Sequence, residues 1–201
     1  MPNTIAALVI AAGASKRMPN QIKQLLPWKN STLLGNSIHQ ISPLVDTVHI
    51  VLGAHADKIK TNLPEYAVCH INPNWEKGMG TSIAYGIQQI IKNGLVPNAV
   101  IILVPDQPLM DTEYFTTLKN VYLEADDINI VATDYGNQRT GVPALFDQSL
   151  FGELQKLEED YGAKRIIQMN LARTKLIAGS GKEVDVDTYE AYTALVQCMG
   201  L

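Results

Sequence analysis

Apolar residues along the chain follow two alternating patterns. Short continuous apolar runs at 5–10 and 99–104 are typical of strands that are buried on both faces of a parallel sheet. Other stretches carry apolar residues at helical spacing, as residues 33–41 do after Ser31, a residue type that caps helices. The pattern predicts further strands at 48–52, 67–71, 128–132, 143–146 and 175–177, and an extended piece at 184–186. It predicts helices at 31–41, 55–63, 81–91, 112–123, 151–157, 163–169 and 189–199.

The predicted strands and helices alternate almost throughout the chain. Such alternation is typical of a mixed or parallel sheet that carries helices on both faces. We therefore expect an α/β protein with a Rossmann-like, three-layer α/β/α sandwich around a mostly parallel mixed sheet. Because the sequence has no internal repeat and no linker, we expect a single domain over residues 1–201.

The composition narrows the possible classes of protein. With 46% hydrophobic and 18% charged residues among 201, the chain has the make-up of a globular protein. A formal net charge of −4 gives no basic surface for nucleic acid, although a local basic loop can still bind a nucleotide. No apolar run is long enough to span a membrane and no targeting segment precedes the first strand, so we expect a cytoplasmic protein with no membrane partner. Cys69 and Cys198 lack metal or redox spacing and are expected to be buried free thiols.

The segment Ala11-Ala12-Gly13-Ala14-Ser15-Lys16-Arg17 directly follows the first predicted strand. Open α/β sheets bind ligands at the C-terminal ends of their strands, and small residues let a ligand approach the backbone. The two cations, with Lys23 close behind them, suit a phosphorylated ligand; the alternative is a tight turn with solvated cations. The loop lacks the later glycine of the dinucleotide fingerprint, and the chain has no GxxxxGK[ST] motif, which disfavours hydride transfer and ATPase chemistry.

Asp106 follows the second strong apolar run and stands between Pro105 and Pro108. A carboxylate at the end of a central strand, close to a cationic loop, is suited to hold Mg²⁺ against a phosphate, because Mg²⁺ takes one or two carboxylates and completes its shell with water and substrate. The alternative is an Asp that closes a turn.

Two further segments are candidates for binding. In Asp185-Val186-Asp187, alternation along an extended piece puts both carboxylates on one face, and Asp187 suits either a metal or the cap of the final helix. Gly78-Met79-Gly80-Thr81-Ser82 leads into a predicted helix, whose N-terminus can bind an anion or a ribose hydroxyl. The alternative there is a helix capped by Thr81 or Ser82. The four histidines are scattered, and we assign them no zinc or nucleophilic chemistry.

Seven motifs, taken together and in order, resemble those of the nucleotidyltransferases of the molybdenum cofactor type, and the similarity covers nearly the whole chain. The branch that the motifs resemble most is molybdenum cofactor cytidylyltransferase. The motifs are Ala11-Ala12-Gly13-Ala14-Ser15-Lys16-Arg17-Met18, Lys23-Gln24-Leu25-Leu26-Pro27, Asn72 with Trp75 and Gly78-Met79-Gly80-Thr81-Ser82, Pro105-Asp106-Gln107-Pro108-Leu109, Gly141-Val142-Pro143-Ala144-Leu145-Phe146, Asp160-Tyr161-Gly162-Ala163-Lys164, and Asp185-Val186-Asp187-Thr188.

The resemblance implies transfer of a nucleotidyl group from an NTP to a phosphorylated acceptor, with release of pyrophosphate. It suggests CTP as the donor, because Ala-Ala-Gly accompanies cytidine use in this branch, and the phosphate of a molybdopterin-type cofactor as the acceptor. A molybdoenzyme or its chaperone is then a possible partner. The residues that the resemblance assigns to nucleotide binding are Ala11, Ala12, Gly13, Ser15, Arg17, Lys23, Gly80 and Ser82. Those it assigns to catalysis are Arg17, Lys23 and Asp106, with Asp106 and Asp187 as ligands of Mg²⁺.

Three departures from the family pattern mark where this chain differs. The segment Pro19-Asn20-Gln21-Ile22 is one residue longer than usual before Lys23, Val142 stands where many members have His, and Tyr189 stands where Pro is common after Thr188. Two other functions stay open from the sequence: a nucleotidyltransferase acting on a sugar phosphate or another small phosphate, and a nucleotide- or cofactor-binding chaperone of a molybdoenzyme without turnover. In the enzyme, an acceptor phosphate oxygen would attack the α-phosphorus in line, so that catalysis rests on positioning and charge stabilisation.

Overall fold

A computed structural model describes residues 3–18, 20–94, 96–159 and 162–201. Its main sheet has seven strands in the order β5-β4-β1-β6-β8-β7-β9, and six of them run parallel while β8 runs antiparallel to both of its neighbours. The strands are β1 (Ile5–Ala11), β4 (Thr47–Leu52), β5 (Ala67–Ile71), β6 (Ala99–Leu103), β7 (Ile130–Asp134), β8 (Thr140–Asp147) and β9 (Thr174–Ala178). The expected mostly parallel mixed sheet is therefore confirmed.

Strand β1 lies in the interior of the sheet and shows why its sequence is apolar throughout. All seven of its residues are buried. Ala6, Leu8 and Ile10 point into one hydrophobic cluster, whereas the alternate residues point into the cluster on the opposite face. A strand with both faces covered needs no polar side, which is the reason for the continuous apolar run.

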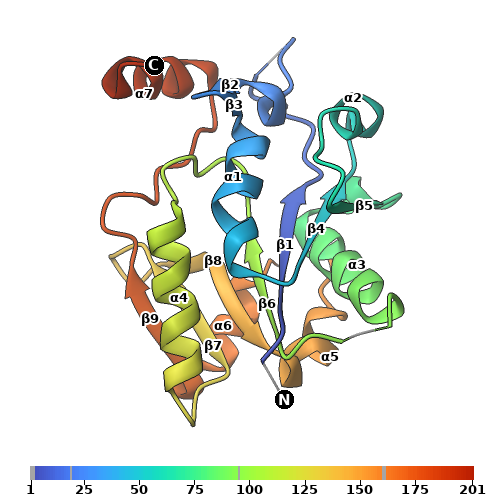
Figure 1. The fold of residues 1–201 in the computed structure, drawn as a ribbon, viewed down its shortest axis with the longest axis vertical. Coiled ribbons are helices and arrows are strands. Elements are labelled where there is room, and N and C mark those ends of the chain that lie inside the picture. Colours follow the sequence, from blue (N-terminus) through green and yellow to red (C-terminus); the bar gives the residue numbers. More distant parts are fainter. Residues whose placement is uncertain (1–2, 19, 95, 160–161) are drawn as a thin grey trace.

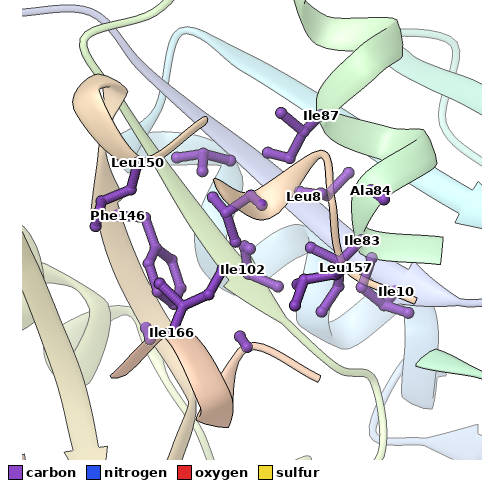
Figure 2. Packing of buried hydrophobic residues seen from close by; sticks show 14 of the residues in the cluster. Leu8, Ile10, Ile83, Ala84, Ile87, Ile102, Phe146, Leu150, Leu157 and Ile166 are labelled. Carbon is purple, nitrogen blue, oxygen red and sulfur yellow. The ribbon is translucent and has the colours of Figure 1, made fainter. Parts of the chain in front are cut away.

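Helices cover both faces of the sheet (Figure 1) and complete the expected three layers. One face carries α1 (Leu33–Ile41), α2 (Ala56–Lys60) and α4 (Thr112–Glu124). The other face carries α3 (Met79–Lys92), α5 (Phe151–Leu154) and α6 (Lys164–Met169), whose apolar side chains pack on Leu8, Ile102 and Phe146 (Figure 2). Gly86 of α3 lets that helix approach the sheet, because a Cβ there would stand 2.6 Å from Leu8 Cδ1.

A third hydrophobic cluster joins the two ends of the chain beside the sheet. The short hairpin of β2 (Pro27–Trp28) and β3 (Ser31–Thr32) packs against the C-terminal helix α7 (Tyr189–Met199). Val186 is fully buried in this cluster next to Trp28, and the Tyr192 hydroxyl donates to the Pro27 carbonyl at 2.7 Å. The cluster fixes the segment before α7 against the N-terminal half of the molecule.

Several boundaries differ from those that the sequence predicts. Helix α1 begins at Leu33 and not at Ser31, because Ser31 pairs in the hairpin and Thr32 is the cap, accepting from the Gly35 N–H at 3.0 Å. The helix predicted at 55–63 covers Ala56–Lys60, since His55 has a left-handed backbone with φ of 58°. The helix predicted at 151–157 ends at Leu154.

The structure also changes what was expected of the cysteine and histidine side chains. Cys198 is exposed and Cys69 is half-buried, so that neither free thiol is fully buried, contrary to the expectation. His49 and His70 are brought together by the pairing of β4 with β5, with His49 Nδ1 2.9 Å from His70 Nε2. In the described part of the chain, no helix is both long and apolar enough to cross a membrane.

Candidate active site

A cleft of about 870 Å³ opens at the C-terminal ends of β1 and β6, where the strand order reverses. The chain leaves β1 toward β4 and β5 on one side, and returns to β6 on the other side. In open α/β sheets this switch point leaves a crevice between the loops after the two strands. The loop after β1, the loop after β6, the start of α3, the β7–β8 turn and the segment before α7 all contribute to the lining.

The loop after β1 is shaped by the buried side chain of Gln24. Its amide nitrogen donates to the Ala11 carbonyl at 3.1 Å and to the Gly13 carbonyl at 2.9 Å, and its amide oxygen accepts from Ser15 Oγ at 3.3 Å. Ser15 Oγ also accepts from the backbone N–H of Lys23 at 3.0 Å. Ser15 has a left-handed φ of 54°, and Gly13 faces open space, with no described atom within 4 Å of an added Cβ. The loop is thus held open at Gly13, where a ligand can reach the backbone.

Lys23 lies between two carboxylates from distant parts of the chain. Its ammonium is 2.7 Å from Asp106 Oδ2 and 3.3 Å from Asp187 Oδ1. Arg17, whose side chain is 66% exposed, pairs with the same Asp187 oxygen at 2.9 Å. The longer loop before Lys23 therefore leaves this residue in the cleft; Pro19, in that loop, is outside the described residues.

Burial of Val186 orients the segment that carries Asp185 and Asp187. The Val186 N–H donates to the Asp106 carbonyl at 2.8 Å, and its side chain is fully buried, while the two flanking acids line the cleft. Thr188 caps α7 by accepting from the Ala191 N–H at 3.2 Å, so that Asp187 is not the cap. The pKa of Asp185 is raised, chiefly by partial desolvation; the hydrogen bond from Gln107 lowers it by less, and the negative charges of Asp106 and Asp187 raise it further.

The oxygen donors at this end of the cleft suit a hard divalent cation. Asp106 Oδ1 is buried and has no hydrogen-bond partner among the described residues, although Oδ2 binds the Lys23 ammonium. In the described part of the chain, no group of three or more His, Cys, Asp or Glu side chains forms a metal cage. A cation held by Asp106 and Asp187 would complete its shell with water and phosphate oxygens, as Mg²⁺ commonly does.

The start of α3 forms another wall of the cleft. Ser82 is buried and lines it, and its hydroxyl accepts from the buried amide of Asn72 at 3.1 Å. The helix begins at Met79, with Gly78 as a cap that has no side-chain hydrogen bond, so that neither Thr81 nor Ser82 caps it. Thr81 instead donates to the Gly78 carbonyl at 2.9 Å.

The structure brings most of the predicted site residues together at this cleft. Its lining includes Ala12, Gly13, Ser15, Arg17, Lys23, Ser82, Asp106 and Asp187. Ala11 and Gly80 do not line it: the Ala11 side chain lies in the core, and the Gly80 N–H donates to the Glu159 carbonyl at 2.9 Å. Asp160 and Tyr161 of the sixth motif are outside the described residues.

Sequence reasoning missed four residues that contribute to the cleft. Gln24 holds the loop after β1 through its hydrogen bonds, and Gln107 donates a hydrogen bond to the Tyr135 hydroxyl. Arg139 lies in the β7–β8 turn and lines the cleft. Gln24 and Gln107 belong to two of the seven motifs, so their positions in the sequence could have indicated a role in the cleft. Tyr135 and Arg139 stand in a loop without periodicity or motif, where the sequence gives no such signal.

The fold and the site define a class: an α/β protein with a cationic loop and paired carboxylates in a cleft at a topological switch point. Comparison with known proteins identifies the family. A model of the MobA-like NTP transferase domain matches residues 7–175, and the chain belongs to this family. It is accordingly an NTP transferase, that is, a nucleotidyltransferase.

Nicotine blue oxidoreductase and molybdenum cofactor cytidylyltransferase are among the seven curated proteins that are similar to the chain in sequence. Nicotine blue oxidoreductase of Paenarthrobacter nicotinovorans is 28% identical, over 92% of this chain and 93% of that protein. Molybdenum cofactor cytidylyltransferase of Escherichia coli (strain K12) is also 28% identical, but over 44% of this chain and 46% of that protein.

Solved structures share the fold over nearly the whole chain. A nucleotidyl transferase from Methanothermobacter thermautotroptrophicus superposes with a TM-score of 0.81 at 19% identity, covering 98% of this chain and 97% of that one. Rv0371C from Mycobacterium tuberculosis H37Rv, in complex with manganese, gives a TM-score of 0.75 at 19% identity, covering 98% of this chain and 100% of that one.

Proposed function

We propose that this protein transfers CMP from CTP to the phosphate of a molybdopterin-type cofactor, in a Mg²⁺-dependent reaction that releases pyrophosphate. The observation that carries the proposal is the meeting of Lys23, Asp106 and Asp187 at the switch point, with 2.7 Å and 3.3 Å between the ammonium and the two carboxylates. The sequence similarity to the cytidylyltransferase of Escherichia coli supports the choice of donor and acceptor.

In this proposal each of the site residues has a defined role. Gly13 and Ser15 border the triphosphate, and Ser82 lies beside the nucleoside. Arg17 and Lys23 stabilise the charge that develops on the leaving pyrophosphate, since a guanidinium fork matches phosphate geometry and an ammonium acts as a point charge. Asp106 and Asp187 would hold Mg²⁺, which when bound supplies neutralisation of the phosphate charges. No protein nucleophile is required, because the acceptor phosphate attacks directly.

Support for the divalent cation comes from the chain's own charges. The Lys23 ammonium already occupies a position between the two carboxylates, and Asp106 Oδ1 is left without a partner in the described part of the chain. The structure of the manganese complex of Rv0371C gives an independent reason to test a divalent metal.

The test is a panel of reactions with the purified protein. Each of the four NTPs is combined with Mg²⁺ and with either molybdopterin cofactor or a set of sugar phosphates, and pyrophosphate release is measured. Release that requires CTP and molybdopterin is the expected result. Release with a sugar phosphate instead would replace the acceptor, and tight CTP binding without release would favour a chaperone without turnover. Reduction of nicotine blue, the activity in the name of one relative, is assayed in parallel.

Asp106→Asn is the decisive variant, with Asp111→Asn as its matched control. We expect Asp106→Asn to abolish pyrophosphate release while the protein stays folded, because a neutral amide lacks the negative charge that would hold the cation against the phosphates. Asp111 caps α4 outside the cleft, accepting from the Tyr114 N–H at 3.0 Å, and Asn also caps helices. The control should therefore keep its activity. Mg²⁺-dependent turnover that survives in Asp106→Asn would refute the assignment.

A further inference from the structure

The two carboxylates of the proposed metal site come from segments that are far apart in the sequence. Asp106 follows β6, whereas Asp187 precedes α7. Two hydrogen bonds join these segments directly: the Val186 N–H donates to the Asp106 carbonyl at 2.8 Å, and Gln107 Nε2 donates to Asp185 Oδ1 at 2.9 Å. The first bond uses backbone groups alone, so that the second is the one that depends on a side chain.

Burial of the Gln107 side chain at this position is costly. The residue is 4% exposed, and its amide oxygen is buried with no hydrogen-bond partner among the described residues. A buried acceptor without a partner costs stability, and an apolar residue of similar shape would avoid that cost. What this amide adds to the fold is therefore its N–H donors and not its oxygen.

Those donors connect three parts of the cleft. Besides Asp185, Gln107 Nε2 donates to the Tyr135 hydroxyl at 2.5 Å, and that hydroxyl in turn donates to the Val142 carbonyl. Tyr135 and Val142 both line the cleft on the β7–β8 side. Gln107 thus links the segment before α7 to the loop that carries Asp106, and both of them to the β7–β8 side of the cleft.

We propose that Gln107 is a positioning residue, which sets the separation of Asp106 and Asp187 by holding Asp185. The inference rests on the proposed function in that it takes these two carboxylates as the metal ligands. Removal of a residue that orients metal ligands without binding the metal itself typically lowers metal affinity by about 10–100-fold. Gln107 acts in this way through its hydrogen bond, not through charge.

The experiment separates the hydrogen bond from charge and from folding. Mn²⁺ alone is titrated into the full chain and free Mn²⁺ is followed by electron paramagnetic resonance, for wild type, Gln107→Leu, Gln107→Glu, and Gln107→Glu combined with Asp185→Asn. Thermal unfolding without metal is measured for each protein, and pyrophosphate release is measured in parallel.

The predicted results differ in sign from those of a purely electrostatic effect. At a pH high enough to ionise both carboxyl groups, Gln107→Glu places a second carboxylate against Asp185 and removes the donor. Mn²⁺ affinity should then fall about 10-fold or more, although the added negative charge alone would raise it. In the double variant, the amide introduced at position 185 donates to the carboxylate introduced at position 107. This exchange restores the bond with the wild-type net charge, and the affinity should return. Gln107→Leu should lose Mn²⁺ affinity while keeping, or raising, the unfolding temperature of the metal-free protein.

Each outcome decides one of the two ideas. Wild-type Mn²⁺ affinity in Gln107→Leu, tighter binding in Gln107→Glu, no recovery in a folded double variant, or no Mn²⁺ binding by the wild type would overturn the positioning role. The predicted affinity pattern without transfer of CMP to a molybdopterin cofactor would overturn the proposed function and leave the positioning role supported.

Discussion

Replacing Lys23 by Met tests whether its ammonium occupies the place of a divalent cation. In the resting protein this ammonium, on a side chain that is 15% exposed, neutralises Asp106 and Asp187 at 2.7 Å and 3.3 Å. Methionine has a similar length and no charge, so the substitution leaves two carboxylates facing each other. A hydrogen bond to a charged group contributes about 1.5–3 kcal/mol, and because these groups remain partly solvated we expect a total loss of about 2 kcal/mol. For a chain of this size that loss lowers the unfolding temperature by roughly 6 °C.

Magnesium should return part of that stability in Lys23→Met. A ligand that binds the folded state at ten times its dissociation constant stabilises it by about 1.4 kcal/mol. The variant should therefore gain roughly 4 °C on addition of Mg²⁺, whereas the wild type gains less, because its ammonium competes for the same oxygens. Turnover should not return with stability, because the contact of the ammonium with the pyrophosphate is lost.

Lys182 offers a matched control with the same arrangement outside the cleft. Its ammonium lies 2.7 Å from Asp111 and 3.6 Å from Glu113, and the Glu113 side chain is 87% exposed. Lys182→Met should lose less than about 1 kcal/mol and keep its turnover. Thermal unfolding is measured with Mg²⁺ and with EDTA for both variants. Equal Mg²⁺ rescue of the two variants, or none in Lys23→Met, would refute the idea that the cleft carboxylates bind the cation.

Three further perturbations test other parts of the molecule. Arg17→Ala should leave the unfolding temperature nearly unchanged, because its ion pair is exposed, but raise the barrier of pyrophosphate release by about 2–4 kcal/mol in steady-state assays. Gln24→Leu should lower the unfolding free energy by about 1–3 kcal/mol and raise the KM for the NTP, since the loop after β1 loses its brace. Burial, and next the charge of His70, lowers the pKa of His49 to about 4; urea unfolding should show up to about 3 kcal/mol lost as the pH falls from 6.5 to 4. This loss should become smaller in a folded His49→Gln variant, where only the part that comes from His70, whose pKa burial also lowers, remains. An unchanged pH profile there would contradict the assignment.

The sequence predicts well those strands whose position depends only on how their own residues are buried. The apolar runs at β1 and β6 are continuous because both faces of those strands are covered, and this local fact places the central strands correctly. The start of α1 could not be predicted in the same way. Ser31 and Thr32 are both good caps, and the choice between them depends on pairing with Trp28 in the hairpin.

Within the candidate site, sequence reasoning is limited by contacts across the chain. The alternative uses of Asp187 could not be separated from the sequence, because they depend on which residue caps α7 and on where Val186 is buried. The sequence places Gln107 in a motif but does not indicate its partner, Asp185, and nothing in it indicates the hydrogen bond from Tyr135 to Val142. The partners of such side chains are fixed only when the sheet order brings β6, β7, β8 and the segment before α7 together.

The balance of charges around the cleft explains why a nucleotide should enter together with a cation. Asp106, Asp185 and Asp187 face two cations, Arg17 and Lys23, at one end of the cleft, and those two cations are already paired with the acids. A triphosphate that bound Lys23 without a cation would take the ammonium away from both carboxylates, leaving them exposed to each other. If Asp106 and Asp187 hold a divalent cation as proposed, that cation would take the place of the ammonium at the carboxylates, and Lys23 would be free to contact the phosphates. Lys23 is thus placed to exchange one partner for the other, and the carboxylates keep a positive charge before and after the exchange.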